Sequence, residues 1–299
     1  MGDFHKSLYR DFKFYILLII LQIQNMKYIL STTLLFAALS LNAQSTSLKE
    51  IWKSKDQLAV PESVLYIPQK QQMYVSLIDG AANKKDAKGS IAILNRDGST
   101  KNSTWITGLN APKGMAISGR KLYVADLDVV HEIDTATAKI TATIRVPEAV
   151  FLNDIAIDKR GISYVSDTRT NKIHRIINNK SEIYLENVTS ANGLKFINNE
   201  LHVLSGTKLL KFNKHKVATQ IAEGLEASGD GLEPDGKGSF IVTCWEGIIY
   251  HIKKDGSKQK LLDVRGKMNT ADIGYDPKSK MLYVPTFNAN SVIAYKIEF

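Results

Sequence analysis

Short apolar runs, each only a few residues long, recur along the chain and are separated by clusters of Gly, Asn, Asp and Lys. The clearest recurring run is found at Met73–Ser76, Leu122–Ala125, Ser163–Ser166, Leu201–Leu204, Phe240–Thr243 and Leu282–Pro285. Neighbouring copies lie about 40 residues apart after a longer first interval, a period typical of β-propeller blades. The heptad-like apolar spacing that helical repeats need is missing from these runs.

Within each copy, the pattern predicts hairpins. The stretch Gly229–Thr243 places an apolar strand before an Asp-Gly turn and a strand rich in β-branched residues after it, which is a strong local hairpin signal. Six copies predict a six-bladed β-propeller over residues 44–299. The last copy ends with Ser291–Phe299, its third strand. We therefore expect Leu48–Trp52 to supply the missing outer strand and so remove an exposed sheet edge.

The N-terminus carries two apolar runs. Residues 26–43 read as a secretory signal, with Met26-Lys27 before an apolar core and Ala43 before the expected cut. Neither this core nor the run Phe14–Ile23 reaches the ~18–20 residues of a membrane span. We expect Met26 to be the true start, residues 1–25 to be an upstream extension, and the protein to be secreted or periplasmic without stable membrane insertion. The alternative is an uncleaved N-terminal anchor.

Charge and side-chain chemistry exclude several functions. The formal charge is +9, but the lysines are scattered, and no basic stripe with interleaved aromatic residues indicates a nucleic-acid partner. Cys244 is the single cysteine, so an intramolecular disulfide is excluded, and its strand setting favours a buried small apolar role over a nucleophilic one. The His residues lack metal-binding spacing, and no Gly-x-Ser-x-Gly elbow indicates a serine hydrolase. An insertion, Asp79–Lys88, is expected to shape one face of the first blade.

The residues at the head of each first strand form a second alignment. Its second position reads Glu62, Lys113, Asn153, Asn192, Asp230 and Ala271. Because the first strand of every blade lines the central channel, these residues are expected to form a ring at one mouth. Two carboxylates and two amides are suitable oxygen ligands for a hard divalent cation, and Asp154 and Asp272 follow one position later. The alternative is that Asx and Gly serve turn chemistry here, although Glu62 has no such role.

The same segments resemble the SMP-30/gluconolactonase/LRE family, six-bladed propellers with one divalent metal in the channel. The resemblance rests on Pro61–Tyr66, Asn153–Asp158, Asn192–Leu194 and Asp230–Val242, which occur in the family's order. It implies that Glu62, Asn192 and Asp230 bind the metal. It also implies that Asn153 contacts the substrate or completes the metal shell.

Two departures concern specificity. Phe151 stands where the family's sugar-lactonases often carry Arg, and Lys113 adds a cation to the ring.

These observations predict a metal-dependent lactone hydrolase that acts on a small lactone or sugar-derived substrate. We expect Ca²⁺ as the cofactor, with Zn²⁺, Mn²⁺ or Mg²⁺ as alternatives. Asp230 is predicted to be the general base, Asn153 to orient the substrate, and Lys113 to bind a carboxylate or the developing oxyanion. The alternatives are a non-catalytic secreted propeller that binds a small or anionic ligand, and a protein-interaction scaffold.

Overall fold

The computed structural model describes residues 14–27 and 45–299, which fall into two separate units. Residues 14–27 form a helix, and the second unit, Thr46–Glu298, is built almost wholly of β-strands. No helix among the described residues combines the length and apolar character needed to cross a membrane. Of the predicted signal segment 26–43, only Met26 and Lys27 are among the described residues. The role of this segment therefore stays a prediction.

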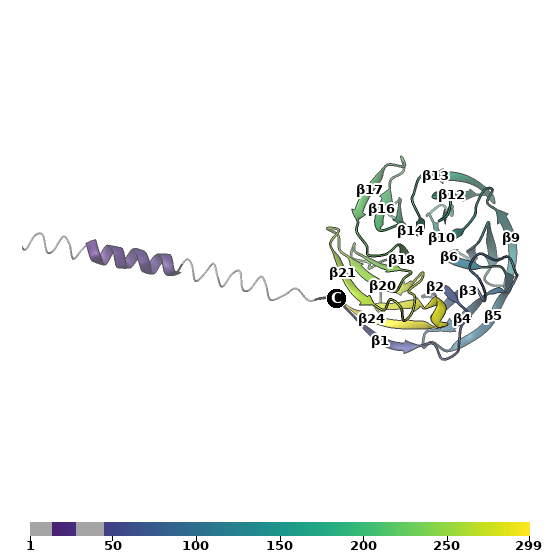
Figure 1. Cartoon of the computed structure of the whole chain (residues 1–299), viewed down its shortest axis with the longest axis horizontal. Helices are drawn as coiled ribbons and strands as arrows, with labels where there is room; N and C mark the ends of the chain where they lie inside the picture. The colour runs from purple at the N-terminus through teal and green to yellow at the C-terminus, as the bar shows by residue number, and fades with distance from the viewer. Residues whose placement is uncertain (1–13, 28–44) are drawn as a thin grey trace, which may run out of the picture. The chain divides into compact units, whose positions relative to one another are not determined.

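The second unit is a ring of six antiparallel four-stranded sheets, which confirms the six-bladed propeller (Figure 1). Blades one to three are β2 (Pro61–Ile67), β3 (Gln72–Leu77), β4 (Gly89–Asn95), β5 (Thr100–Leu109); β6 (Pro112–Ser118), β7 (Lys121–Asp126), β8 (Val129–Asp134), β9 (Lys139–Arg145); and β10 (Leu152–Ile157), β11 (Ser163–Asp167), β12 (Lys172–Ile177), β13 (Lys180–Leu185). Blades four to six are β14 (Ala191–Ile197), β15 (Glu200–Ser205), β16 (Lys208–Phe212), β17 (Ala218–Ala222); β18 (Gly229–Pro234), β19 (Phe240–Cys244), β20 (Ile248–Ile252), β21 (Lys258–Asp263); and β22 (Gly274–Asp276), β23 (Met281–Pro285), β24 (Val292–Glu298), β1 (Ser47–Lys53).

Strand β1 is the outer strand of blade six, in the position that the sequence predicts. It runs antiparallel to β24 from the pair Ser47↔Glu298 to the pair Lys53↔Ile293. The ring of Trp52 lies 5.9 Å from that of Tyr283 and covers the turn at Gly98. Gly98 has a φ of 79°, and a Cβ there would lie 2.6 Å from Trp52, so this turn requires glycine on both counts.

The hydrophobic core lies between neighbouring blades. One cluster, for example, joins Tyr66 and Val75 of blade one to Tyr283 and Ala294 of blade six. Each sheet is therefore buried on both faces, and its inner strand is fixed in position near the axis by packing from both sides.

The inner strands are irregular at their heads. The pairing with the second strand shifts register between Leu152 and Ile155 in blade three, and similar shifts occur in blades one, two, four and five. Such irregularities re-aim side chains at the end of a strand. In three blades, a backbone N–H group at such a shift donates a hydrogen bond to a side-chain hydroxyl of the second strand. These bonds run from Ser63 to Ser76 Oγ (2.9 Å), from Asp154 to Ser166 Oγ (2.9 Å) and from Gly231 to Thr243 Oγ1 (2.8 Å).

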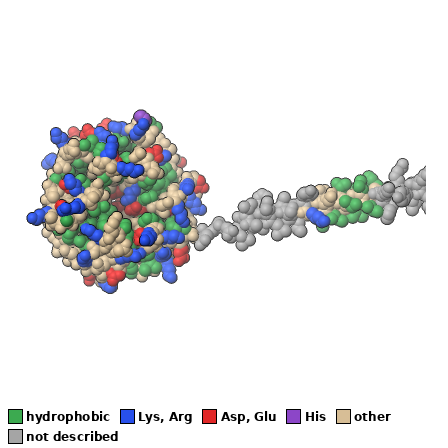
Figure 2. Space-filling view, turned by 180° about the vertical axis from the view of Figure 1, so that it is seen from behind, with side chains coloured by type: hydrophobic (Ala, Val, Ile, Leu, Met, Phe, Trp, Pro, Cys, Tyr) green, Lys and Arg blue, Asp and Glu red, His purple; other side chains and the backbone are tan. Residues whose placement is uncertain are grey.

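Lys and Arg side chains are spread over the propeller face seen in Figure 2 and do not gather in one patch. This distribution agrees with the interpretation of the lysines as scattered, solvated side chains. The net positive charge of the chain therefore does not indicate a binding surface for an extended polyanion on that face.

Candidate functional site

The ring predicted at the channel mouth is present. A pocket of about 230 Å³ at the heads of the inner strands is lined by Glu62, Lys113, Asn153, Asn192 and Asp230, five of the six aligned residues. The sixth residue, Ala271, is buried but does not line the pocket. The remaining lining residues are Ala82, Phe151, Trp245 and Phe287.

Close contact between neighbouring blades brings the ring residues together. A Cβ at Gly193 would lie 2.2 Å from the carbonyl oxygen of Asp230, so only glycine permits this approach of blades four and five. The closeness lets the Asn192 side-chain amide donate a hydrogen bond to Asp230 Oδ1 (2.9 Å). Across the seam between blades six and one, Asp272 N–H donates to the Glu62 carbonyl oxygen (3.0 Å).

The two ring carboxyls hold their protons more tightly than exposed carboxyls do. Burial raises the pKa of Glu62 well above its usual range, and repulsion from Asp230 raises it further, while Lys113 partly opposes the shift. Burial and the charge of Asp272 raise the pKa of Asp230 to about 8, against the lowering effect of the Asn192 hydrogen bond. Both shifts favour the neutral acid unless positive charge enters the pocket.

Two buried oxygen atoms of this ring have no hydrogen-bond partner among the described residues: Glu62 Oε2 and Asn192 Oδ1. Burying such an atom without a partner is costly, and in folded proteins each one calls for an explanation. Because Asn192 donates from its nitrogen to Asp230, its oxygen remains the available acceptor. Glu62, Asn192 and Asp230 therefore fit a hard cation by the chemistry of their donor atoms.

No group of three or more His, Cys, Asp or Glu side chains within residues 14–27 and 45–299 is placed to hold a metal ion. The ligand set predicted from the sequence is of another kind, because it contains an amide in place of a third acid. Asn153 lines the same pocket, and its amide donates to Thr168 Oγ1 (3.1 Å), which leaves its oxygen for a ligand.

Lys113 lies in the pocket wall with its charge largely buried. Its Nζ donates to the carbonyl oxygens of Ala111 (2.9 Å) and Ala82 (3.1 Å) and lies 4.4 Å from the centre of the Phe151 ring. Burial lowers the pKa of Lys113 to about 8, although Glu62 opposes the shift. An ammonium group has three N–H donors, so one remains for a ligand in the pocket. The contact with Ala82 also shows that the insertion 79–88 forms part of this mouth.

Asp154 and Asp272 do not line the pocket, and their carboxylates hydrogen-bond to the neighbouring blade. Asp154 Oδ2 accepts from Leu194 N–H (2.6 Å), and Asp272 Oδ2 accepts from the Ser63 hydroxyl (2.6 Å). Lys195, which pairs with Glu233 at 2.9 Å, offsets part of their charge, and these carboxylates hold the pKa of Lys195 above its usual value despite burial. Glu62, Asp154, Asp230 and Asp272 are buried here, whereas Lys113 is the one buried lysine among these residues, so buried acid is in excess.

Three lining residues were missed from the sequence. Ala82, Trp245 and Phe287 all lie in the loops that join the second strand of a blade to the third, as does Thr168. In an antiparallel blade these loops are at the same end as the heads of the inner strands. Only their place after a second strand is shared, because the side chains that follow the second strands differ from blade to blade.

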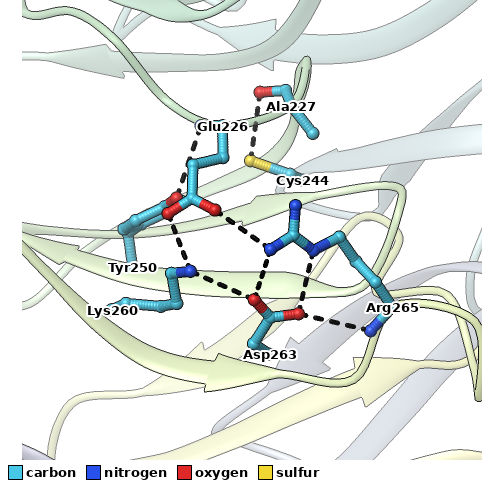
Figure 3. Close-up of polar contacts among 7 residues, drawn as sticks. All are labelled: Glu226, Ala227, Cys244, Tyr250, Lys260, Asp263 and Arg265. Atoms are coloured by element: carbon cyan, nitrogen blue, oxygen red, sulfur yellow. Dashed lines mark hydrogen bonds and ion pairs between the residues drawn. The ribbon is translucent and has the colours of Figure 1, made fainter.

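The other candidates have structural roles. Cys244 is fully buried and donates to the Ala227 carbonyl oxygen, and burial raises the pKa of its thiol to about 12 (Figure 3). Beside it, Lys260 and Arg265 join Glu226 to Asp263 in an exposed ion-pair network on blade five (Figure 3). The His202 ring is buried and contacts the Glu200 carbonyl oxygen, which is a structural role.

The fold and pocket define a six-bladed propeller with an acid-rich channel mouth. The sequence matches no family model and no curated protein. Solved structures similar to this chain include a streptogramin B lyase, with 13% identity, a TM-score of 0.64 and coverage of 85% of this chain and 98% of that chain. A gluconolactonase from Xanthomonas campestris has 14% identity, a TM-score of 0.63 and coverage of 88% and 93%. A luciferin-regenerating enzyme has 14% identity, a TM-score of 0.61 and coverage of 85% and 96%. These likenesses establish the fold, which is the one that the resemblance described above implies.

The raised carboxyl pKa values predict how stability varies with pH in the metal-free protein. Between the usual carboxyl pKa near 4 and about 8, folded Asp230 binds more protons than it does in the unfolded chain, so stability falls as pH rises. We expect the melting temperature to drop by roughly 5 °C or more from pH 5 to 8. The Asp230→Asn variant should show a smaller drop. Replacing the exposed Glu186 by Gln should leave the slope unchanged, and an equal slope in all three proteins would contradict the assignment.

Proposed function

We propose that this protein is a lactone hydrolase whose channel pocket holds one divalent cation through Glu62, Asn192 and Asp230. The observation that carries the proposal is the pair of unpartnered buried oxygens, Glu62 Oε2 and Asn192 Oδ1, beside a second buried carboxyl. A cation would satisfy both oxygens and offset the excess acid. The similarity in fold to a gluconolactonase supports the reaction class, although fold alone does not fix a function.

The residues of the pocket divide the chemistry between them. When bound, the cation supplies Lewis acidity, which polarises a lactone carbonyl and lowers the pKa of water. Asp230 accepts the proton of the attacking water as general base. Asn153, held by Thr168, orients the substrate through its amide oxygen, and the remaining N–H of Lys113 stabilises the oxyanion or a substrate carboxylate.

The pocket walls favour a compact substrate with apolar surface. Phe151, Trp245 and Phe287 surround the mouth, and Lys113 and the Arg169 guanidinium lie over the Phe151 ring at 4.4 and 4.5 Å. Phe151 therefore offers a ring where a sugar-lactonase often presents an Arg side chain. A small lactone with few hydroxyl groups suits these walls better than a polyhydroxylated sugar lactone.

Thermal unfolding with added cations tests the proposal. After chelation, Ca²⁺, Mg²⁺, Mn²⁺ and Zn²⁺ are added in turn to the unmodified chain and to the Glu62→Gln/Asp230→Asn variant. A cation at 100 times its Kd stabilises the folded state by about 2.7 kcal/mol. We expect such a shift only in the unmodified chain. Asp56→Asn/Glu186→Gln, which removes two exposed carboxylates, is the matched control and should keep the shift.

The outcomes separate the hydrolase from its alternatives. No shift with any of the four cations would reject the metal site and favour a propeller that binds an anionic ligand at Lys113. A shift that persists in the Glu62→Gln/Asp230→Asn variant would place the cation elsewhere. A shift limited to the unmodified and control chains justifies assays with a panel of small lactones.

A further inference from the structure

A second and larger cavity lies at the other end of the strands from the channel pocket, between blades three and four. Its volume is about 490 Å³, within the usual range for small-molecule sites. It is bounded by the turn β10–β11, the turn β14–β15 at Asn199, and the turn β16–β17. The turns β10–β11 and β14–β15 leave the inner strands at the ends opposite to Asn153 and Asn192, and the turn β16–β17 is at that same end of blade four. The cavity is therefore separate from the site proposed for hydrolysis.

Four aromatic side chains line this cavity: Tyr164, Tyr184, Phe196 and Phe212. The Tyr164 and Phe196 rings stack at 5.3 Å with an interplanar angle of 19°, and Tyr184 meets Tyr164 edge-on at 4.9 Å. The packed rings give a rigid surface that needs little ordering when a ligand binds.

Positive charge surrounds the rings. Arg160 and Arg175 each use Nε and Nη2 on one carboxylate, that of Asp158 and that of Glu182. A guanidinium has five N–H donors, so each arginine retains donors that these contacts do not use. Lys159, Lys214 and Lys216 also line the cavity, and none forms an ion pair within the part of the chain that the structure describes. The local balance is three uncompensated positive charges.

The position of Lys216 joins the two features. Its Nζ lies 4.9 Å from the centre of the Tyr184 ring, and the Arg175 guanidinium lies 5.4 Å from the same centre. A ligand that reaches this ring therefore meets cations beside an aromatic surface. Sugar rings with a carboxylate combine an apolar face, hydroxyl groups and a negative charge, which match the rings, the Asn199 amide and the lysines in turn.

We propose that this cavity is a binding site for acidic saccharides of about disaccharide size, recognised through their ring faces and carboxylates. The inference does not depend on the proposed hydrolase activity. An aromatic carboxylate shares part of this chemistry, so the test includes one. The channel pocket and this cavity share no lining residue, which makes the two sites distinguishable by mutation.

Isothermal titration of the full chain, freed of metal by a chelating resin, tests the proposal with digalacturonate, neutral cellobiose and 4-nitrobenzoate as probes. Digalacturonate should bind, and cellobiose should bind at least ~10-fold more weakly, a difference of about 1.4 kcal/mol. Lys214→Ser/Lys216→Ser should weaken digalacturonate binding ~10-fold or more. Tyr184→Leu should weaken it several-fold. Lys253→Ser/Lys254→Ser removes two exposed lysines from the corresponding turn of blade five and should leave the affinity within about twofold.

Each other result overturns the proposal. Absence of digalacturonate binding rejects the site. If Lys214→Ser/Lys216→Ser and Lys253→Ser/Lys254→Ser lose the same affinity for digalacturonate, the binding depends on the net charge of the protein and not on this cavity. Binding of 4-nitrobenzoate without digalacturonate rejects the saccharide assignment. If Tyr184→Leu fails to fold, the comparison of the two exposed lysine pairs still decides the question. The channel variant Glu62→Gln/Asp230→Asn should bind digalacturonate with unchanged affinity, whether or not it has lost a cation. A failure of the hydrolase proposal can therefore be told apart from a failure of this one.

Discussion

The Asp230→Asn variant is expected to hydrolyse small lactones about 10²- to 10⁴-fold more slowly than the unmodified chain, the usual contribution of a positioned general base. Asn keeps the shape of the side chain and one oxygen, but it cannot accept a proton at neutral pH. Asp230 also accepts the Asn192 hydrogen bond that leaves Asn192 Oδ1 available, so the substitution weakens the proposed cation site as well. Initial rates at saturating cation concentration measure the effect.

The control for this experiment is Glu186→Gln, which removes an exposed carboxylate in the loop after β13 and should retain the full rate. Cation binding is measured in parallel by thermal unfolding. Full hydrolytic activity of Asp230→Asn with the cation bound would show that another group takes the proton.

Deletion of residues 46–54 is expected to lower the free energy of unfolding by more than about 5 kcal/mol, a large part of the stability of an ordinary domain. The deletion removes β1 and exposes the edge of β24 along its whole length. It also removes Thr46, whose backbone carbonyl accepts from Gln259 (2.7 Å) and whose hydroxyl contacts His251 (3.2 Å) in blade five. Urea unfolding followed by tryptophan fluorescence and circular dichroism measures the loss.

Two single substitutions test whether the strand acts through packing. Trp52→Ala should cost about 3 kcal/mol because a large ring is removed from the contacts with Tyr283 and Gly98. Ile51→Ser changes a neighbouring residue whose side chain is about half exposed and should cost under ~1 kcal/mol. Equal effects of the two substitutions, or a deletion variant as stable as the full chain, would show that β1 adds little to the closed ring.

The sequence predicts the blades well because two features repeat with the same period, the apolar strands and the polar turns between them. Runs such as Leu122–Ala125 align by their own composition, and the turns between them align by Gly, Asn and Asp. The same alignment places Glu62, Asn192 and Asp230 at equivalent positions. Rotation about the channel axis then brings them together, although they lie far apart in the sequence.

The remainder of the pocket could not be obtained this way, because its residues do not repeat. Trp245 and Phe287 follow second strands whose other copies end in different side chains, so no column marks them as a set. One of the two hydrogen bonds that hold Lys113 goes to the carbonyl oxygen of Ala82, in an insertion found in one blade only. The sequence also does not show that Asp272 lies near enough to Asp230 for its charge to raise the pKa of Asp230.

The closure of the ring by β1 has a consequence for the order in which the molecule can form. Ser47 is made among the first residues of the propeller and Glu298 among the last, yet they are paired neighbours in one sheet. Contacts between such distant parts of a chain form slowly, and the blades made first must wait with an open edge. Glu62 lies on the same seam, since its carbonyl oxygen accepts from Asp272 of blade six. The channel pocket is therefore complete only when the seam between blades six and one is closed, so a ligand held by both Glu62 and Asp230 would favour the closed ring.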